Sequence, residues 1–258
     1  VDLTELDLST FNTSQVTDMD SMFNNCNSLT TLNLGNNFDT ANVTSMYSMF
    51  NNCVSLTSLD VRTWDTSKVT NMQYLFQGCQ KVTRLDVSDW NTGQVTNMNY
   101  MFSGCLSLRG LNLSSFDTSN VTSMAYMFAG FAYDPDTDTT TDTPMNLLTI
   151  TFGPGWDTSK VTNISSMFYY CNKIIALDLS MFETGYIQYA NHTFARCSSL
   201  HSINLSSATT ILTLEHLYTF SGVNNNIQIV VGSTAVQSWV NSRLSESGIT
   251  NATVTVSS

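Results

Sequence analysis

Charged residues are scarce in this chain of 258 residues, and basic residues are scarcer still. Lys, Arg, Asp and Glu make up 11% of the sequence, against roughly a quarter in an average soluble protein. Nine basic residues against twenty acidic ones give a formal net charge of −11. This balance argues against nucleic acid and against an anionic membrane surface as partners, because both are bound through basic patches.

Groups suited to catalysis and long apolar runs are also few. The chain has three histidines, His192, His201 and His216. They show no nucleophile–base spacing, and there is no glycine-rich phosphate loop. No apolar run approaches the ~18 residues of a membrane span. We therefore expect neither an enzyme nor insertion into a membrane. Hydrophobic residues still make up 42% of the chain, which is enough for a folded core.

The cysteines reveal an internal repeat. Their spacings are 27, 26, 26, 66 and 26 residues, and in the long gap Phe131 stands at the expected position, before a further repeat that carries a 13-residue insertion. The shared skeleton is L-x-L-x-x-[F/W]-x-T-x-x-V-T-x-M-x-x-M-F-x-x-C-x-x-L. Copies begin at Leu6, Leu32, Leu59, Leu85, Leu111, Ile150, Leu177 and Ile203. Such a period predicts a solenoid, in which each unit buries its apolar side chains against its neighbours.

Each repeat also predicts local structure. The L-x-x-L-x-L segment predicts a short strand with inward leucines, and we expect Met22 and Phe23 to lie in a helical or 3₁₀ turn. The methionines, tryptophans and cysteines recur at fixed registers, which predicts core positions. We expect the cysteines to be free thiols in a buried ladder, because parallel stacking orients them wrongly for disulfides. Residues 233–244 carry an apolar helical face, and residues 252–256 alternate like a strand.

The pattern D-T-S-x-V-T-x-M-x-x-M-F-x-x-C-x-x-L-x-x-L-D-L-S resembles the BspA-like leucine-rich-repeat family of bacterial surface proteins, over about residues 3–226. The resemblance implies a secreted or cell-surface adhesin with no catalytic residues. We expect an α/β repeat fold, a right-handed leucine-rich-repeat solenoid of about eight repeats of 26–27 residues. The solenoid would span residues 1–226 with an insertion at 132–144, and a helix–strand cap would span 227–258. Val1–Leu6 reads as the end of a preceding repeat, so we expect a monomeric part of a longer chain.

Outward positions beside the inward leucines define a predicted strand face. Its candidate ligand-binding residues are Asn33, Asp60, Arg84, Asp86, Asn112 and Asp178. The face is polar, mildly acidic and without the aromatic anchors of tight interfaces. We expect an extracellular protein or glycan to bind through a hydrated interface, either on this face or at the 132–144 insertion. A solvated sheet face without a ligand is the alternative.

Two columns of threonine suggest a competing function. Stacked threonines on a stiff, uncharged surface are what an ice-binding protein requires. The candidate residues are Thr40, Thr44, Thr66, Thr70, Thr92, Thr96, Thr118 and Thr122. The simpler explanation is local, because Asp–Thr pairs suit turns. A third alternative is a structural spacer or filament subunit.

The insertion contains a partial calcium-loop pattern. Asp134, Asp136, Asp138 and Asp142 fall at positions 1, 3, 5 and 9 of the template. The glycine expected at position 6 is Thr139, and the acidic residue expected at position 12 is Met145. We therefore keep two hypotheses for this loop, a calcium site and a solvated excursion. No other cofactor is expected.

Overall fold

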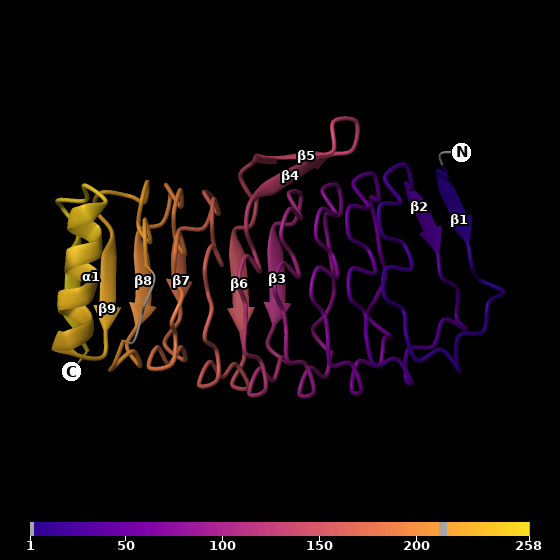
Figure 1. Ribbon diagram of the computed structural model, residues 1–258, viewed down its shortest axis with the longest axis horizontal. Coiled ribbons are helices and arrows are strands. Elements are labelled where there is room, and N and C mark those ends of the chain that lie inside the picture. Colours follow the sequence, from indigo (N-terminus) through magenta and orange to yellow (C-terminus); the bar gives the residue numbers. More distant parts are fainter. Residues whose placement is uncertain (1–2, 212–215, 258) are drawn as a thin grey trace.

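The computed structural model describes residues 3–211 and 216–257, which form an elongated stack of coils (Figure 1). The strands are β1 (Glu5–Asp7), β2 (Thr31–Asn33), β3 (Gly110–Leu113), β4 (Phe131–Asp134), β5 (Thr139–Asp142), β6 (Thr149–Phe152), β7 (Ala176–Asp178), β8 (Ser202–Leu205), β9 (Gln228–Val231) and β10 (Thr253–Val256). The only helix in the described ranges is α1 (Thr234–Glu246). The predicted solenoid is confirmed.

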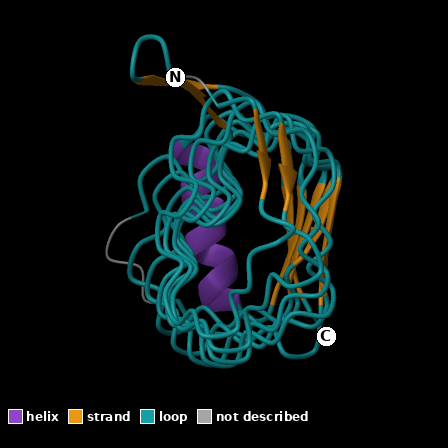
Figure 2. Ribbon diagram, turned by 90° about the vertical axis from the view of Figure 1, so that its right-hand side faces the viewer, coloured by secondary structure: helices purple, strands orange, loops and turns teal. Residues whose placement is uncertain are grey.

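The strands pair so that equivalent positions of successive repeats lie side by side. Leu6 pairs with Leu32, and Leu177 pairs with Ile203, in parallel register. The pairs β1–β2 and β3–β6 and the four-stranded order β10–β9–β8–β7 are all parallel, whereas β4 and β5 form an antiparallel hairpin. Viewed along the stack, the coils superimpose as an oval with the parallel strands on one wall (Figure 2). The skeleton therefore predicted which residues stack between coils.

A second line of backbone pairing runs through the segment that follows V-T in each repeat. Parallel bridges join Asp18 to Ser45 and continue from coil to coil as far as Tyr189. We call this line the bridge ladder. We call the side of the solenoid that carries the parallel strands the strand wall. There, by contrast, no backbone hydrogen bond joins residues 58–62 or 84–88 to a neighbouring coil within the described chain. The central coils are thus held together on the side that the leucine pattern did not predict.

The segment around Met22 and Phe23 is a run of turns, so the predicted helical or 3₁₀ turn is wrong. The amides of Met22 and Asn24 donate within their own coil, to Met19 and Ser21. The amides of Phe23 and Asn25 donate instead to the next coil. Alternate amides therefore point along the stack, which a helix does not permit because all its amides point along its own axis.

The core is filled by columns of like side chains. One phenylalanine from each repeat stacks on the next, with ring centroids 5.0 to 5.9 Å apart from Phe23 to Phe220. The tryptophans Trp64, Trp90 and Trp156 and most of the methionines are buried, as predicted. Phe11 and Met22 differ, being 54% and 42% exposed. Both lie in the first described coil, which packs against one neighbouring coil only.

The cysteines form the predicted ladder of free thiols. All six are unpaired, and every one except the half-buried Cys26 is buried. Each buried sulfur donates to the carbonyl of a core phenylalanine in the preceding coil, as Cys53 does to Phe23 at 3.2 Å and Cys197 to Phe168 at 3.0 Å. The ladder fixes the thiols as part of the packing between coils.

The helix and strand expected at the C-terminal end are present. The hydroxyl of Ser233 accepts from the amide of Val236 and caps α1. Val236, Val240 and Leu244 are buried. Strand β10 then extends the sheet by pairing with β9. Within the described residues, no helix has the length and apolar character needed to span a membrane.

Candidate functional site

The predicted ligand-binding residues do share one wall of the solenoid. Asn33, Asp60, Arg84, Asn112 and Asp178 are exposed and Asp86 is half-buried. Where the coils carry strands, these positions pair directly, as in Asp7↔Asn33 and Asp178↔Asn204. The side-chain amide of Asn33 donates to the Asp7 carboxylate at 3.1 Å, and the side-chain amide of Asn204 donates to the Asp178 carboxylate. The wall is therefore a polar surface with side chains ordered along the stack.

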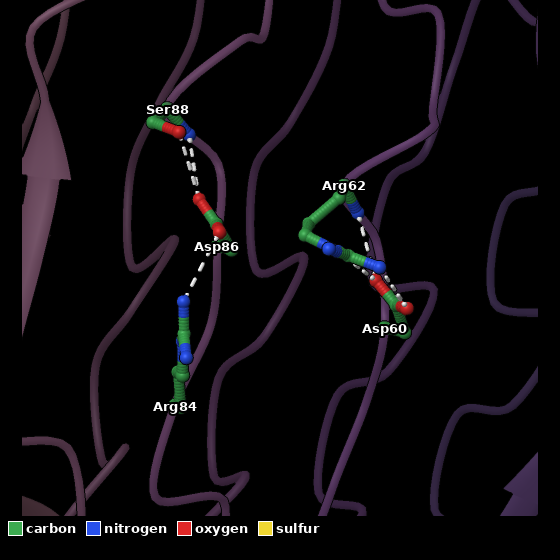
Figure 3. A network of polar contacts seen from close by, with 5 residues as sticks. All are labelled: Asp60, Arg62, Arg84, Asp86 and Ser88. Atoms are coloured by element: carbon green, nitrogen blue, oxygen red, sulfur yellow. Dashed lines mark hydrogen bonds and ion pairs between the residues drawn. The ribbon is translucent and has the colours of Figure 1, made fainter.

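The charges gather on two adjacent central coils (Figure 3). The Arg62 guanidinium binds Asp60 with two hydrogen bonds of 3.1 Å, one from Nε and one from Nη2. Arg84 Nη2 lies 3.4 Å from Asp86 Oδ2, and the Ser88 hydroxyl donates to Asp86 Oδ1 at 2.8 Å. We call Asp60, Arg62, Arg84 and Asp86 the charged cluster.

Sequence reasoning missed Arg62, which lies just after the predicted strand positions. A signal was available, because two of the nine Lys and Arg residues fall near the strand positions of consecutive repeats. The turn that follows the strand places Arg62 back over its partner, since the Asp60 carboxylate accepts the Arg62 amide at 3.2 Å. Such a bond to the residue two positions later is the ordinary conformation of an aspartate-initiated turn.

Both carboxylates of the charged cluster are held in the ionised form. The side chain and amide of Arg62 lower the pKa of Asp60. Hydrogen bonds from Ser88 do the same for the pKa of Asp86, with a smaller contribution from Arg84. Two cations thus face two anions at neutral pH, and the cluster has no net charge although the whole chain is acidic.

The surface beside the charged cluster is hollowed. One hollow of about 360 Å³ is lined by Asp60, Arg62, Arg84 and Asp86, together with Leu32, Thr83 and residues 57–59. A second hollow of about 420 Å³ lies between Asn33 and Arg62. Both lie beside residues 58–62, whose backbone makes no hydrogen bond to the backbone of a neighbouring coil. The charged side chains that line the hollows are accessible to a ligand.

The first threonine column cannot be an ice-binding surface. Thr40, Thr66, Thr92 and Thr118 are at most 2% exposed. Their hydroxyls donate to backbone carbonyls of the following coil, at 2.7 to 3.0 Å. The placement of these four residues on an exposed face is wrong, because they serve as hydrogen-bonding links inside the stack.

The second threonine column is exposed, as expected. Thr44, Thr70, Thr96 and Thr122 lie in line on the surface. Each hydroxyl donates to the carbonyl of the threonine one coil before, at 3.1 to 3.2 Å, and the same carbonyl accepts the backbone amide. Of the two predicted columns, therefore, one exposed row remains. The ice-binding hypothesis needs a two-dimensional array.

The acidic insertion is a hairpin that spreads its aspartates apart. Asp134 pairs with Thr139 near the tip, whereas Asp142 pairs with Phe131 at the base. Asp142 there binds Arg196 at 2.9 Å and the Tyr169 hydroxyl at 2.8 Å. In the parts of the chain that the structure describes, no three His, Cys, Asp or Glu side chains form a group that could hold a metal ion. The predicted calcium ligands are not brought together.

Tyrosines on the bridge ladder side form a second surface feature, which sequence reasoning also missed. The rings of Tyr74, Tyr100 and Tyr126 stack on one another, with centroids 4.8 and 4.5 Å apart. Their equal spacing of 26 residues was the available signal. We call these three residues the tyrosine stripe.

Comparison with known proteins gives one family. The family described as "Mycoplasma protein of unknown function, DUF285" matches residues 2–85, 55–142 and 151–230. No curated protein and no solved structure matches the chain.

Proposed function

Because the chain belongs to the DUF285 family of proteins of unknown function, we propose its role from its surfaces: a non-catalytic module that binds an extracellular protein or glycan. The proposal places the ligand on the strand wall of the central coils. It also places the protein outside the cell, as a secreted or surface-attached adhesin.

The repeat skeleton supports a more specific fold type within this proposal. The inward leucines of L-x-x-L-x-L and the recurring cysteine favour a BspA-like, right-handed leucine-rich-repeat solenoid of eight repeats of 26–27 residues. Residues 227–258, which hold α1 and β10, then serve as its cap. Leucine-rich-repeat units of this kind present a ligand with one continuous wall, because every repeat contributes the same outward positions.

One observation carries the assignment of the ligand site, namely the charged cluster over its hollows. Asp60 and Arg62 are exposed by 67% and 60% of their side chains, so their pairing contributes little to stability. A charge pair that is not needed for folding is available for recognition. Guanidinium and carboxylate groups at fixed positions suit a ligand that offers hydroxyl, amide or charged groups, which proteins and glycans both do.

Neutralising the charged cluster tests this assignment. Surface plasmon resonance against panels of extracellular proteins and glycans would compare the native chain with Asp60→Asn/Arg62→Gln/Arg84→Gln/Asp86→Asn. For ligands that bind this wall, we expect the variant to lose about tenfold or more in affinity, since central charged groups are frequent hot spots. The fold should be retained, because no buried group changes.

A matched control is available in the same coil. Lys81→Gln/Asp89→Asn removes one charge of each sign where the cluster variant removes two, so it likewise leaves the net charge unchanged, and both positions are exposed and lie outside the strand wall. This control should bind as the native chain does. Equal binding by the cluster variant and the native chain for every ligand found would contradict the proposed site.

A further inference from the structure

The tyrosine stripe occupies a backbone position that does not require tyrosine. Tyr74, Tyr100 and Tyr126 have φ values of 60°, 59° and 59°, in the left-handed region that bulky residues seldom adopt. The equivalent position is a serine in three other coils, as at Ser48 and Ser166 with a φ of 55°, and it is His192 and Tyr218 in two more. The turn therefore forms equally well with a small side chain, and the large rings need another explanation.

The rings are arranged as a continuous surface column. Where the next coil has Ser166 in place of tyrosine, the hairpin and the following turn supply rings instead. Phe131 lies 5.9 Å from Tyr126 and 5.4 Å from Tyr169, centroid to centroid. All of these rings are half-buried. The column is thus maintained across the coil of Ser166, whose own residue at this position is small.

The hairpin β4–β5 is fixed against this column. Phe131, its first residue, stacks within the column, and at its other end Asp142 binds Arg196 and Tyr169. The Gln80 side chain donates to the carbonyl of Tyr133, which ties the hairpin to the coil that carries Tyr74. The hairpin accordingly extends back over the preceding coils (Figure 1). Hairpin and stripe therefore form one surface.

This surface combines aromatic edges with unpaired acidic groups. Asp134, Asp136 and Asp138 are exposed and have no ion-pair partner among the described residues. Arg196 shows how a basic group fits here. The guanidinium carbon of Arg196 lies 5.6 Å from the Tyr169 ring centroid and 5.2 Å from that of Tyr170, while its Nη1 pairs with Asp142. Aromatic rings and a carboxylate together hold the arginine.

We propose that the tyrosine stripe and the acidic hairpin form a docking surface for a basic segment of another protein. Charge complementarity selects a basic partner, because the hairpin and the chain as a whole are acidic. The stacking selects a protein over a glycan. Sugars bind to exposed faces of aromatic rings, whereas in this column the ring faces that point along the stack are covered by the neighbouring rings. Tyrosine edges with hydroxyl groups are instead typical of protein interfaces, where rigid rings are ordered at low entropic cost.

The test uses a labelled synthetic peptide of alternating arginine and tyrosine, followed by fluorescence anisotropy on the whole chain. We expect Tyr74→Ser/Tyr100→Ser/Tyr126→Ser to weaken binding about tenfold, as the loss of clustered aromatic hot spots does. Serine occurs naturally at this turn, so the variant keeps a permitted residue. It also leaves the net charge unchanged, so attraction to an acidic chain in general would survive the substitution.

A second variant addresses the hairpin without touching the column. Asp134→Asn/Asp136→Asn/Asp138→Asn should weaken binding of the same peptide to a similar extent. The charged-cluster variant should leave that binding unchanged. The proposal is overturned if both the serine and the asparagine variants bind as the native chain does. It is also overturned if a neutral oligosaccharide binds and is lost in the serine variant. A dimer in sedimentation that the serine variant disperses would overturn it by identifying a second copy as the occupant.

Discussion

The hydroxyl of Thr92 donates to the carbonyl of Asp117 at 2.8 Å and accepts the amide of the same residue at 2.9 Å. One side chain thereby makes both hydrogen bonds that a backbone bridge would make between neighbouring coils. Thr118 repeats this arrangement with Asp157, and Thr158 repeats it with Glu183. The buried threonine column is a hydrogen-bonding link between successive coils at this turn.

Replacing Thr92 by valine should therefore destabilise the solenoid. Valine keeps the shape but removes both hydrogen bonds between the buried Thr92 hydroxyl and the Asp117 backbone, which together contribute about 1–3 kcal/mol. The matched control is Thr96→Val, four residues later in the same coil. Thr96 is exposed, so water can replace the hydrogen bond from its hydroxyl to the Thr70 carbonyl. The substitution should therefore change the free energy of unfolding by no more than about 0.5 kcal/mol. Urea unfolding measures both, and equal losses would contradict the assigned role.

The thiol ladder should be unreactive until the protein unfolds. Burial raises the pKa of Cys53 and that of Cys197 to about 12. At pH 8 these thiols are therefore protonated, and the thiolate is the reactive species. Only Cys26, which is half-buried, should react with a thiol reagent in the native protein. Denaturation without reductant should expose all six, and a lower count would reveal a disulfide.

Acid should weaken the fold through its aspartate-initiated turns. Hydrogen bonds from Ser67 lower the pKa of Asp65, and those from Ser119 lower the pKa of Asp117. A carboxyl with a lowered folded-state pKa contributes stability above its unfolded value of about 3.9, and this is lost as the pH falls through the folded value. Denaturation curves between pH 6 and pH 3 should show the decline.

A substitution separates this effect from general acid unfolding. Asparagine already forms the same turn in this chain, since the Asn91 side chain accepts the Gly93 amide at 3.1 Å. Asp65→Asn/Asp117→Asn should therefore fold normally and lose less stability between pH 6 and pH 3 than the native chain does. An unchanged pH dependence would mean that other groups dominate acid unfolding.

Ice binding should be absent. Of the two predicted threonine columns one is buried, and in the exposed one the hydroxyls already donate to backbone carbonyls. We expect ice crystals to grow round and unshaped in the presence of the native chain. The suitable control is Thr70→Tyr/Thr96→Tyr in the exposed row, because substitutions at Thr66 or Thr92 would disrupt buried links. Faceted crystals that the control abolishes would restore the ice-binding hypothesis.

The repeat skeleton predicted the parts of the fold that depend on repeated apolar positions. The pairing of Leu177 with Ile203 and the buried tryptophans follow directly from it. The bridge ladder did not, because positions such as Ser45 and Asn71 vary in type and form the bridges with their backbones. A side-chain pattern carries no information about such a ladder.

The candidate sites likewise differ in whether a side-chain pattern alone could predict them. The strand face was predictable because alternation in a strand fixes which residues point outward. The two threonine columns could not be told apart, since they share a residue type and differ only in the turn between them. The left-handed turns at Tyr74 and Ser48 were likewise hidden, because neither residue is typical of that backbone conformation.

The one-sided pairing of the central coils has a mechanical consequence. Residues 58–62 and 84–88 have no backbone bonds between coils, while the bridge ladder behind them is continuous. The bridge ladder then keeps the coils at a fixed separation on its own side. Bending of the stack would change the separation of the coils on the strand wall. A ligand that spans several coils of that wall, as we propose, would restrict this bending and stiffen the whole stack.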